Sequence, residues 1–245
     1  DNIKPILPTV NDITWGCEYT VEVPIAEDNC DTEITGVADR STTFSEPGEH
    51  TINWTFTDAS GNSSSIQQTV TIEALQAEIE TVNIDCFGFD NGSAEVIATG
   101  GVGNLIYHWE YLPENESSWQ NISGNGTSQV NLPPDDYRVT VSDQNGCLLE
   151  LAFTISQPDE LQMADPTSTP VSCFEGSDGT ISAGTVSGGT VDENGNYQYS
   201  IDNENWNTSG EFSNVEAGNH TIFVKDANNC ALQVTVNVEE PDILN

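Results

Sequence analysis

One β-hairpin is written three times in this chain, and that repeat limits the possible folds more than any other feature. In the clearest copy, His220 to Val238, apolar residues alternate with polar ones on both sides of an Asp-Ala-Asn-Asn turn. Alternation with period two predicts a strand with one buried face, and Asp and Asn between two such runs predict a hairpin turn. Hairpins of the same pattern begin at His50 and at Tyr137. Three copies indicate an array of modules.

The three hairpins divide the 245 residues into predicted modules at residues 1–75, 76–158 and 159–245. Each module has roughly 80 residues, which is enough for the core of a small all-β sandwich. The stretch Gln157-Pro-Asp-Glu-Leu161 at the second junction recurs as Glu240-Pro-Asp-Ile-Leu244. We therefore expect a further unit beyond residue 245, and a longer protein of which this chain is one piece.

The charge of the chain excludes several classes of partner. Forty acidic residues stand against four basic ones, for a net charge of −36. Such a surface repels nucleic acids and anionic lipid headgroups. Apolar runs fall far short of the roughly 18 residues of a membrane span. We expect neither a nucleic-acid partner nor direct membrane insertion.

The six cysteines fall two per module and include no Cys-x-x-Cys pair. Even, module-matched numbers favour disulfides and an oxidising, extracellular setting over a zinc site. We predict a bond inside each module, pairing Cys17 with Cys30, Cys86 with Cys147 and Cys173 with Cys230. A seven-stranded sandwich would put Cys86 and Cys147 at opposite poles. Either the first strand is broken or the topology differs from the immunoglobulin fold, and both alternatives stay open.

The first module carries the motif of a known family. Its Cys…Asp-Asn-Cys…Gly-x-His-Thr-Ile…Asp-Ala-Ser-Gly-Asn pattern begins at Cys17 and ends at Asn62. This pattern resembles hyalin-repeat (HYR-like) modules. The resemblance implies an immunoglobulin-like sandwich of the kind found in cell-surface arrays.

The second and third modules are copies of each other. Cys86-Phe-Gly-Phe-Asp-Asn-Gly matches Cys173-Phe-Glu-Gly-Ser-Asp-Gly, Gly100-Gly101 matches Gly188-Gly189, and Trp119 matches Trp206. Together with the closing hairpin, this pattern resembles the SprB-type repeat of gliding-motility adhesins and related surface proteins of Bacteroidetes. One departure is Asn229, where the family's turn usually has the glycine seen at Gly146. The resemblance implies surface adhesion by filaments exported through the type IX pathway.

These observations together predict three tandem immunoglobulin-like β-sandwich modules that form an elongated rod. We interpret the chain as a segment of a large extracellular adhesin, in which it is mainly a spacer that projects an adhesive tip. Its partners are then neighbouring repeats of the same long chain. The sequence contains no Ser-His-Asp, Cys-His or His-Glu-x-x-His arrangement and no phosphate loop, so we expect no enzymatic activity.

Two other functions remain open at this stage. Trp109, Tyr111 and Trp119 in the second module could stack on sugars, which would make it a polysaccharide-binding module. Since Trp119 and Trp206 are in register, however, both also fit anchors at the core or sheet edge. A eukaryotic receptor ectodomain is the third class, because eight Asn-x-Ser/Thr sequons are present.

Calcium is the predicted cofactor. Short acidic loops could supply the six to eight oxygens that Ca²⁺ prefers. The candidate ligands are Asp28, Asp31, Asp58 and Asn62 in the first module, Asp90 and Asp143 in the second, and Asp178 and Asp226 in the third. The alternative is that each turn aspartate only caps its turn by accepting backbone N–H bonds. For His50 and His220 we predict a hydrogen bond back to the preceding turn, a position held by Tyr137 in the second module.

Overall fold

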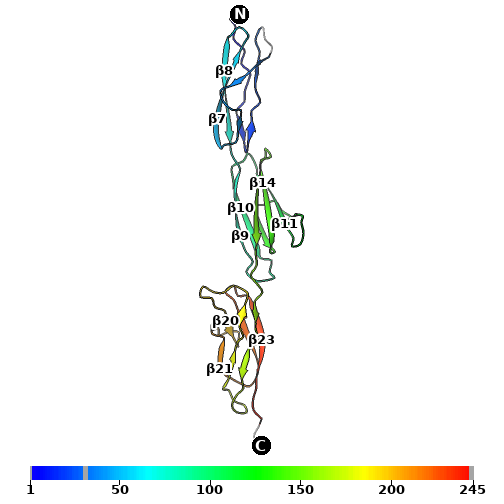
Figure 1. Cartoon of the computed structure of the whole chain (residues 1–245), viewed down its shortest axis with the longest axis vertical. Coiled ribbons are helices and arrows are strands. Elements are labelled where there is room, and N and C mark those ends of the chain that lie inside the picture. The colour runs from blue at the N-terminus through cyan, green and yellow to red at the C-terminus, as the bar shows by residue number, and fades with distance from the viewer. Residues whose placement is uncertain (1, 30–32, 243–245) are drawn as a thin grey trace. The chain divides into compact units, whose positions relative to one another are not determined.

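The computed structural model describes residues 2–29 and 33–242 (Figure 1). The described residues form strands and loops, and no helix occurs among them. By their contacts they group into two compact units: Asp1–Glu80, Ala94–Gln129 and Asp136–Phe153 form unit 1, and Thr81–Ser93, Val130–Asp135 and Thr154–Asn245 form unit 2. No helix in this part of the chain is long and apolar enough to span a membrane.

The first predicted module is built around its hairpin, β7 (Gly48–Thr57) and β8 (Ser63–Ile72). These strands belong to a sheet of order β1-β8-β7-β5, with β1 at Ile13–Trp15 and β5 at Val37–Ala38. Two small strand pairs complete the module: β2 (Tyr19–Thr20) with β6 (Thr43–Phe44), and β3 (Ile25–Ala26) with β4 (Ile34–Thr35). The inward residues of β7, Ile52, Trp54 and Phe56, are fully buried, as the alternation predicts.

The second module has two sheets. One has the order β13-β10-β9, with β9 at Gln76–Val82, β10 at Gly92–Thr99 and β13 at Ser128–Leu132. The other has the order β12-β11-β14-β15, with β11 at Ile106–Leu112, β12 at Gln120–Asn121, β14 at Asp135–Ser142 and β15 at Leu148–Ile155. Trp109, Val139 and Val141 of the second sheet are fully buried.

The third module also pairs two sheets over one core. Strands β17 (Thr167–Thr169), β18 (Gly179–Ser182) and β21 (Glu211–Val215) form one sheet, and β20 (Gln198–Ser200), β22 (Gly218–Lys225) and β23 (Ala231–Val238) form the other. A separate pair joins β16 (Gln162–Met163) to β19 (Val186–Ser187). Ile181 from the first sheet and Ile222 and Val224 from the second lie in the same cluster of buried residues, so the module is a sandwich.

The predicted all-β, immunoglobulin-like class is confirmed, and each of the three hairpins lies where its alternation placed it. No strand pairing among residues 2–29 and 33–242 crosses the predicted boundaries near residues 75 and 158. The division into three modules stays a prediction, because the contacts alone group the chain into two units.

A Gly-Gly pair contacts the backbone of the linker before the second module and of the linker before the third. In unit 1 the N–H of Gly101 donates to the carbonyl of Glu73 at 2.7 Å, and in unit 2 Gly189 donates to Asp159 at 2.8 Å. The preceding glycines, Gly100 and Gly188, have φ of 71° and 77°, and a Cβ on either would collide with a linker carbonyl oxygen. Only glycine allows this approach at that backbone conformation.

Candidate functional site: disulfide joints at the hairpin turns

The disulfides do not pair as the sequence predicts. Cys17 is bonded to Cys147, with a Cα–Cα distance of 5.7 Å, and Cys86 is bonded to Cys230, at 5.6 Å. The predicted pairs Cys86–Cys147, Cys173–Cys230 and Cys17–Cys30 are therefore wrong. Cys173 is exposed and has no disulfide partner among the described residues, and Cys30 lies outside them.

Each observed bond joins one predicted module to the next. In both joints a cysteine in a loop of the earlier module meets the last residue of the hairpin turn in the later one. Cys86 lies in the loop between β9 and β10, and Cys147 directly precedes β15. The two cysteines that a sandwich would put at opposite poles are not bonded to each other, so that conflict disappears.

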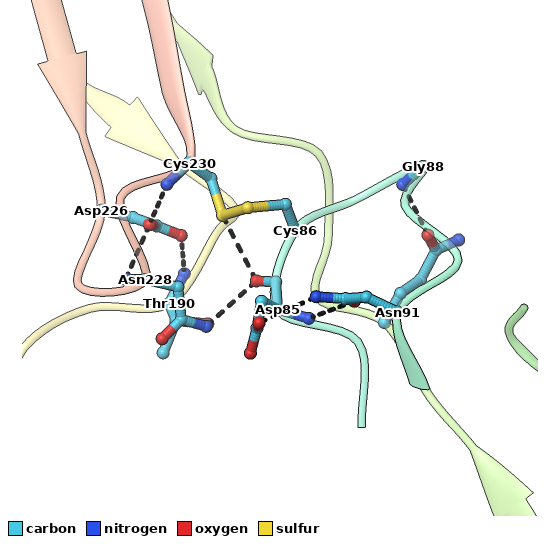
Figure 2. Close-up of a disulfide and its surroundings, with 9 residues drawn as sticks. Asp85, Cys86, Gly88, Asn91, Thr190, Asp226, Asn228 and Cys230 are labelled. Atoms are coloured by element: carbon cyan, nitrogen blue, oxygen red, sulfur yellow. Dashed lines mark hydrogen bonds between the residues drawn. A yellow bond between two sulfur atoms is a disulfide. The ribbon is translucent and has the colours of Figure 1, made fainter. Parts of the chain in front are cut away.

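An aspartate shapes the turn that carries Cys230 (Figure 2). The Oδ1 of Asp226 accepts hydrogen bonds from the backbone N–H groups of Asn228 at 2.9 Å and Cys230 at 2.8 Å. Its Oδ2 accepts from the N–H of Thr190 at 2.8 Å. The side chain is buried at 3 % exposure, so three backbone donors are satisfied by one carboxylate. This capping fixes the position of the cysteine at the end of the turn.

The same cap recurs in the other two hairpins. Asp143 accepts from Asn145 and Cys147, both at 2.9 Å, and from Val102 at 3.0 Å. Asp58 accepts from the N–H groups of Ser60 and Asn62 at 2.9 and 2.8 Å. The third donor at Asp58 is the side-chain amide of Asn62, at 2.8 Å. That amide bond holds the pKa of Asp58 below its usual value.

An asparagine in each cysteine-bearing turn reaches across the joint. Asn228 donates through Nδ2 to the carbonyl oxygen of Asp85 at 3.0 Å, and the Sγ of Cys230 lies 3.3 Å from the same oxygen (Figure 2). In unit 1, Asn145 donates in the same way to the carbonyl oxygen of Thr14, at the long distance of 3.5 Å. The joint therefore combines a covalent bond with a polar contact to the partner backbone.

A cleft of about 450 Å³ lies at the joint in unit 2. The disulfide Cys86–Cys230 forms part of its wall, together with Phe87, Phe89 and Leu161. Phe87 and Phe89 are 48 % and 56 % exposed.

The predicted calcium ligands do not form a cluster in any of the three modules, as far as the described residues show. No group of three or more His, Cys, Asp or Glu side chains within residues 2–29 and 33–242 is placed to hold a metal ion. Asp58, Asp143 and Asp226 act as turn caps. Asp31 lies outside the described residues. Both carboxylate oxygens of Asp28 are buried and have no hydrogen-bond partner among the described residues, which favours a cation there.

The predicted sugar-binding aromatics have different environments. Trp109 is fully buried and donates through Nε1 to the carbonyl of Gly126 at 2.9 Å, so its ring is a core residue and the prediction for it is wrong. Trp119 is half-buried, with the guanidinium of Arg138 at 4.6 Å from its ring centroid. Trp206 has the same arrangement with Lys225, at 4.2 Å. Tyr111 is half-buried beside Tyr137.

The histidine prediction is confirmed. His50 and His220 hydrogen-bond through Nε2 to the carbonyls of Glu46 and Glu216 in the preceding turns, at 2.8 and 2.9 Å. The third histidine, His108, lies on β11 with its Nε2 4.0 Å from the carboxylate of Glu110.

Sequence reasoning missed the joint itself. Equal spacing of repeated cysteines does not distinguish a bond inside a module from a bond to the next one. One signal was present: the first hairpin turn ends in Asn62, where the other two end in cysteine.

Two families match the chain. The model for an HYR-like domain with four cysteines matches residues 6–72, and the SprB repeat model matches residues 79–110 and 166–205. The range 6–72 contains two cysteines, Cys17 and Cys30. A search of the curated proteins found no significant match.

Solved structures of tandem domains are similar to the chain. The three N-terminal domains of the bacteriophage RB49 outer capsid protein Hoc align over 68 % of this chain with a TM-score of 0.42 and 19 % identity, and the alignment spans 59 % of that fragment. Immunoglobulin domains 1–5 of Sidekick-1 align over 96 % of this chain and 58 % of theirs, with a TM-score of 0.36 and 12 % identity. A tetra-tandem repeat from the extending region of a large adhesion protein aligns over 87 % of this chain and 65 % of its own length, with a TM-score of 0.29 and 14 % identity.

Proposed function

The chain carries an HYR-like domain followed by SprB repeats, and from this premise we propose that it is a spacer segment of a large cell-surface adhesin. In this proposal the modules project an adhesive tip, and the parent protein is a gliding-motility filament exported by the type IX pathway. The protein works outside the cell, where disulfides persist.

The observation that carries the spacer proposal is the pair of joints between successive modules. A spacer must keep its length under load, and a linker of a few residues between two folded domains is normally its weakest part. Here a covalent bond spans each linker, from Cys17 to Cys147 and from Cys86 to Cys230. The capped turn and the Asn228 contact position the bonding cysteine, so the joint needs little reorganisation to form.

The joints give the spacer a distinctive limit on its extension. With both bonds intact, the shortest covalent path starts at residue 1, reaches Cys17 and crosses the first disulfide to Cys147. It then runs back along the chain to Cys86, crosses the second disulfide to Cys230 and continues to residue 245. That path has about 95 residues, or about 310–340 Å when fully stretched, against about 810–880 Å for all 245 residues.

Pulling the chain by its two ends in a single-molecule force experiment tests this function. We expect full unfolding of the oxidised chain to stop near the shorter length, and a reducing agent to release the longer one. An oxidised chain that extends to the full length would show that the joints bear no load, and the spacer proposal would then be lost.

Polysaccharide binding is the second candidate function. Trp119 favours it, because its side chain is only half-buried and the next residue, Gln120, pairs with the half-buried Tyr111 of β11. Arg138 lies over one face of that ring, 4.6 Å from its centroid, and a sugar would stack on the opposite face. The arginine is in turn held by Glu110, with 2.6 Å between Nε and Oε2, and that bond lowers the pKa of the glutamate.

A pull-down on insoluble polysaccharide separates the two functions. If the chain binds and Trp119→Ala abolishes binding while Trp206→Ala does not, the second module is a ligand-binding module. A spacer gives no binding in either variant or in the parent chain.

Calcium binding is retained as a proposal for the first module alone. Its support is the buried, unpartnered carboxylate of Asp28, because a bound cation would compensate the cost of burying that charge. Melting curves in EDTA, in calcium and in magnesium at equal ionic strength test it. We expect calcium to raise the midpoint more than magnesium does, and Asp28→Asn to remove that difference. An equal response to the two ions would overturn the calcium proposal.

A further inference from the structure

The loop that carries the unpaired Cys173 is built like the loop that carries the bonded Cys86. We propose that residues 172–179 are the receiving half of another disulfide joint. Its partner is the Asp-x-x-x-Cys hairpin turn of a further SprB repeat that follows this one in the longer protein. This inference goes beyond the spacer function and rests on the equivalence of the two loops, so either can fail without the other.

Two hydrogen bonds of the backbone N–H groups occur at the same positions in both loops. In the Cys86 loop the N–H of Asp85 donates to the side chain of Asn91 at 3.2 Å, and in the Cys173 loop Ser172 donates to Asp178 at 2.8 Å. The carbonyl of each cysteine accepts a bond that closes a turn, from Phe89 at 3.1 Å and from Gly176 at 2.9 Å. Ser172 also holds the pKa of Asp178 below its usual value.

The anchoring of the loops to the end of their module is also the same. Gly88 donates its N–H to the side chain of Gln157 at 2.8 Å, and Glu175 donates to Glu240 at 3.1 Å. Gly88 and Glu175 both have positive φ, of 77° and 54°. A left-handed glutamate is unusual, since a side chain is disfavoured there. The third module nevertheless keeps this loop shape, although Cys173 has no partner among the described residues.

Cys173 is exposed, whereas Cys86 is half-buried where its disulfide forms, and the aromatic residue that follows the cysteine is the same in both loops. Phe174 follows Cys173 as Phe87 follows Cys86, and it is 42 % exposed. Phe87 lines the cleft beside the Cys230 turn. The carbonyl of Asp85, which accepts the bond from Asn228, has its counterpart at Ser172.

A second copy of this chain does not supply such a turn, because both of its cysteine-bearing turns are already bonded, at Cys147 and Cys230. A repeat joined after the third module would supply it. The linker Gln157-Pro-Asp precedes the module whose turn reaches Cys86, and Glu240-Pro-Asp stands at the same place after the third module. Glu240 already bonds the Cys173 loop as Gln157 bonds the Cys86 loop.

Formation of the bond is a two-electron oxidation. The thiols of Cys173 and of the incoming turn cysteine lose two protons and two electrons, and an S–S bond forms. A disulfide oxidant such as oxidised glutathione accepts the two electrons and the two protons and is reduced to two thiols. Secreted proteins meet oxidants of this class during export.

The test extends the full chain by one repeat. Residues 163–245 are repeated after Asn245, since Asn245 aligns with Gln162, and the added copy carries Cys173→Ser so that it brings no competing loop cysteine. After refolding with oxidised and reduced glutathione, free thiols are alkylated and the peptides are mapped by mass. We expect alkylation of the original Cys173 to fall by at least about tenfold relative to the unextended chain, because a disulfide sulfur does not react. The peptide of Cys173 should be linked to the turn cysteine of the added copy.

Two further chains keep the result decisive. An extension that also carries Cys230→Ser should leave Cys173 as reactive as in the unextended chain. A second extension, with residues 77–158 carrying Cys86→Ser, offers the Cys147 turn in case the first added copy does not fold. If neither extension protects Cys173, or if it pairs with Cys30 or with another molecule, the proposal is overturned.

Discussion

The hairpin turn of the first module and those of the second and third share an aspartate but differ at the fourth residue after it. At Asp58 that residue is Asn62, whose side chain donates back to the carboxylate. At Asp143 and Asp226 it is a cysteine, and the spare carboxylate oxygen accepts instead from Val102 or Thr190 in a neighbouring loop. The aspartate therefore stabilises the turn in all three modules. The cysteine, present in two of them, links the turn to the preceding module.

The largest expected effect comes from breaking one joint. The double variant Cys86→Ser, Cys230→Ser removes a bond that closes a stretch of 144 residues. Loop-closure entropy predicts a loss of up to about 5 kcal/mol in the free energy of unfolding. Urea denaturation measures it, with Cys173→Ser as the matched control because that cysteine has no disulfide partner in the described part of the chain. A loss of the same size in Cys173→Ser would contradict the assignment.

Removing the cap of a cysteine-bearing turn should have the next largest effect. Asp226→Ala leaves three backbone N–H groups without their acceptor, and we expect it to cost about 3 kcal/mol of stability. The exposed Asp90, for which no such cap is seen, provides the control variant Asp90→Ala. Equal urea midpoints for the two variants would contradict the capping role.

The third residue after the aspartate gives a smaller comparison between the turns. It has positive φ in all three, at Gly61 (89°), Gly146 (83°) and Asn229 (66°). Asn229→Ala should destabilise the third module by about 1 kcal/mol, because alanine is disfavoured in the left-handed region, whereas Asn229→Gly should be tolerated. Thermal melting of the two variants measures the difference, and an Ala variant as stable as the Gly variant would show that the turn had changed its conformation.

The smallest effect concerns pH and the first turn. Since the Asn62 amide lowers the pKa of Asp58 in the folded state, the ionised carboxylate stabilises the fold above the usual aspartate pKa. That contribution is lost as the pH falls through the lowered value. We expect Asp58→Asn to make the stability of the first module less dependent on pH in the acid range, as followed by melting between neutral and acid pH. An unchanged slope would mean that the bond does not matter for stability.

The sequence predicts the parts of this molecule better than their connections. The alternation around Ile222 and Val224 places the third hairpin correctly, because a buried sheet face has a period of two that any copy repeats. The bond from His220 to Glu216 follows from its place beside the turn. Local chemistry decides both features, so a single sequence contains them.

The disulfide pairing could not be predicted in the same way. Cys86 recurs as Cys173 and Cys147 as Cys230, so pairing within modules and pairing between modules satisfy the repeat equally well. Which loop meets which turn depends on how the linkers run, through contacts such as that of Gly189 with Asp159. The burial of Trp109 was missed for a related reason, because an aromatic residue in a strand can face either side.

The most direct test of the joints is a disulfide map of the oxidised chain. Digestion without reduction, followed by mass spectrometry, should yield one linked peptide pair containing Cys17 with Cys147 and another containing Cys86 with Cys230. Peptides that link Cys86 to Cys147, or Cys173 to Cys230, would show that the bonds lie within the modules and would contradict the account.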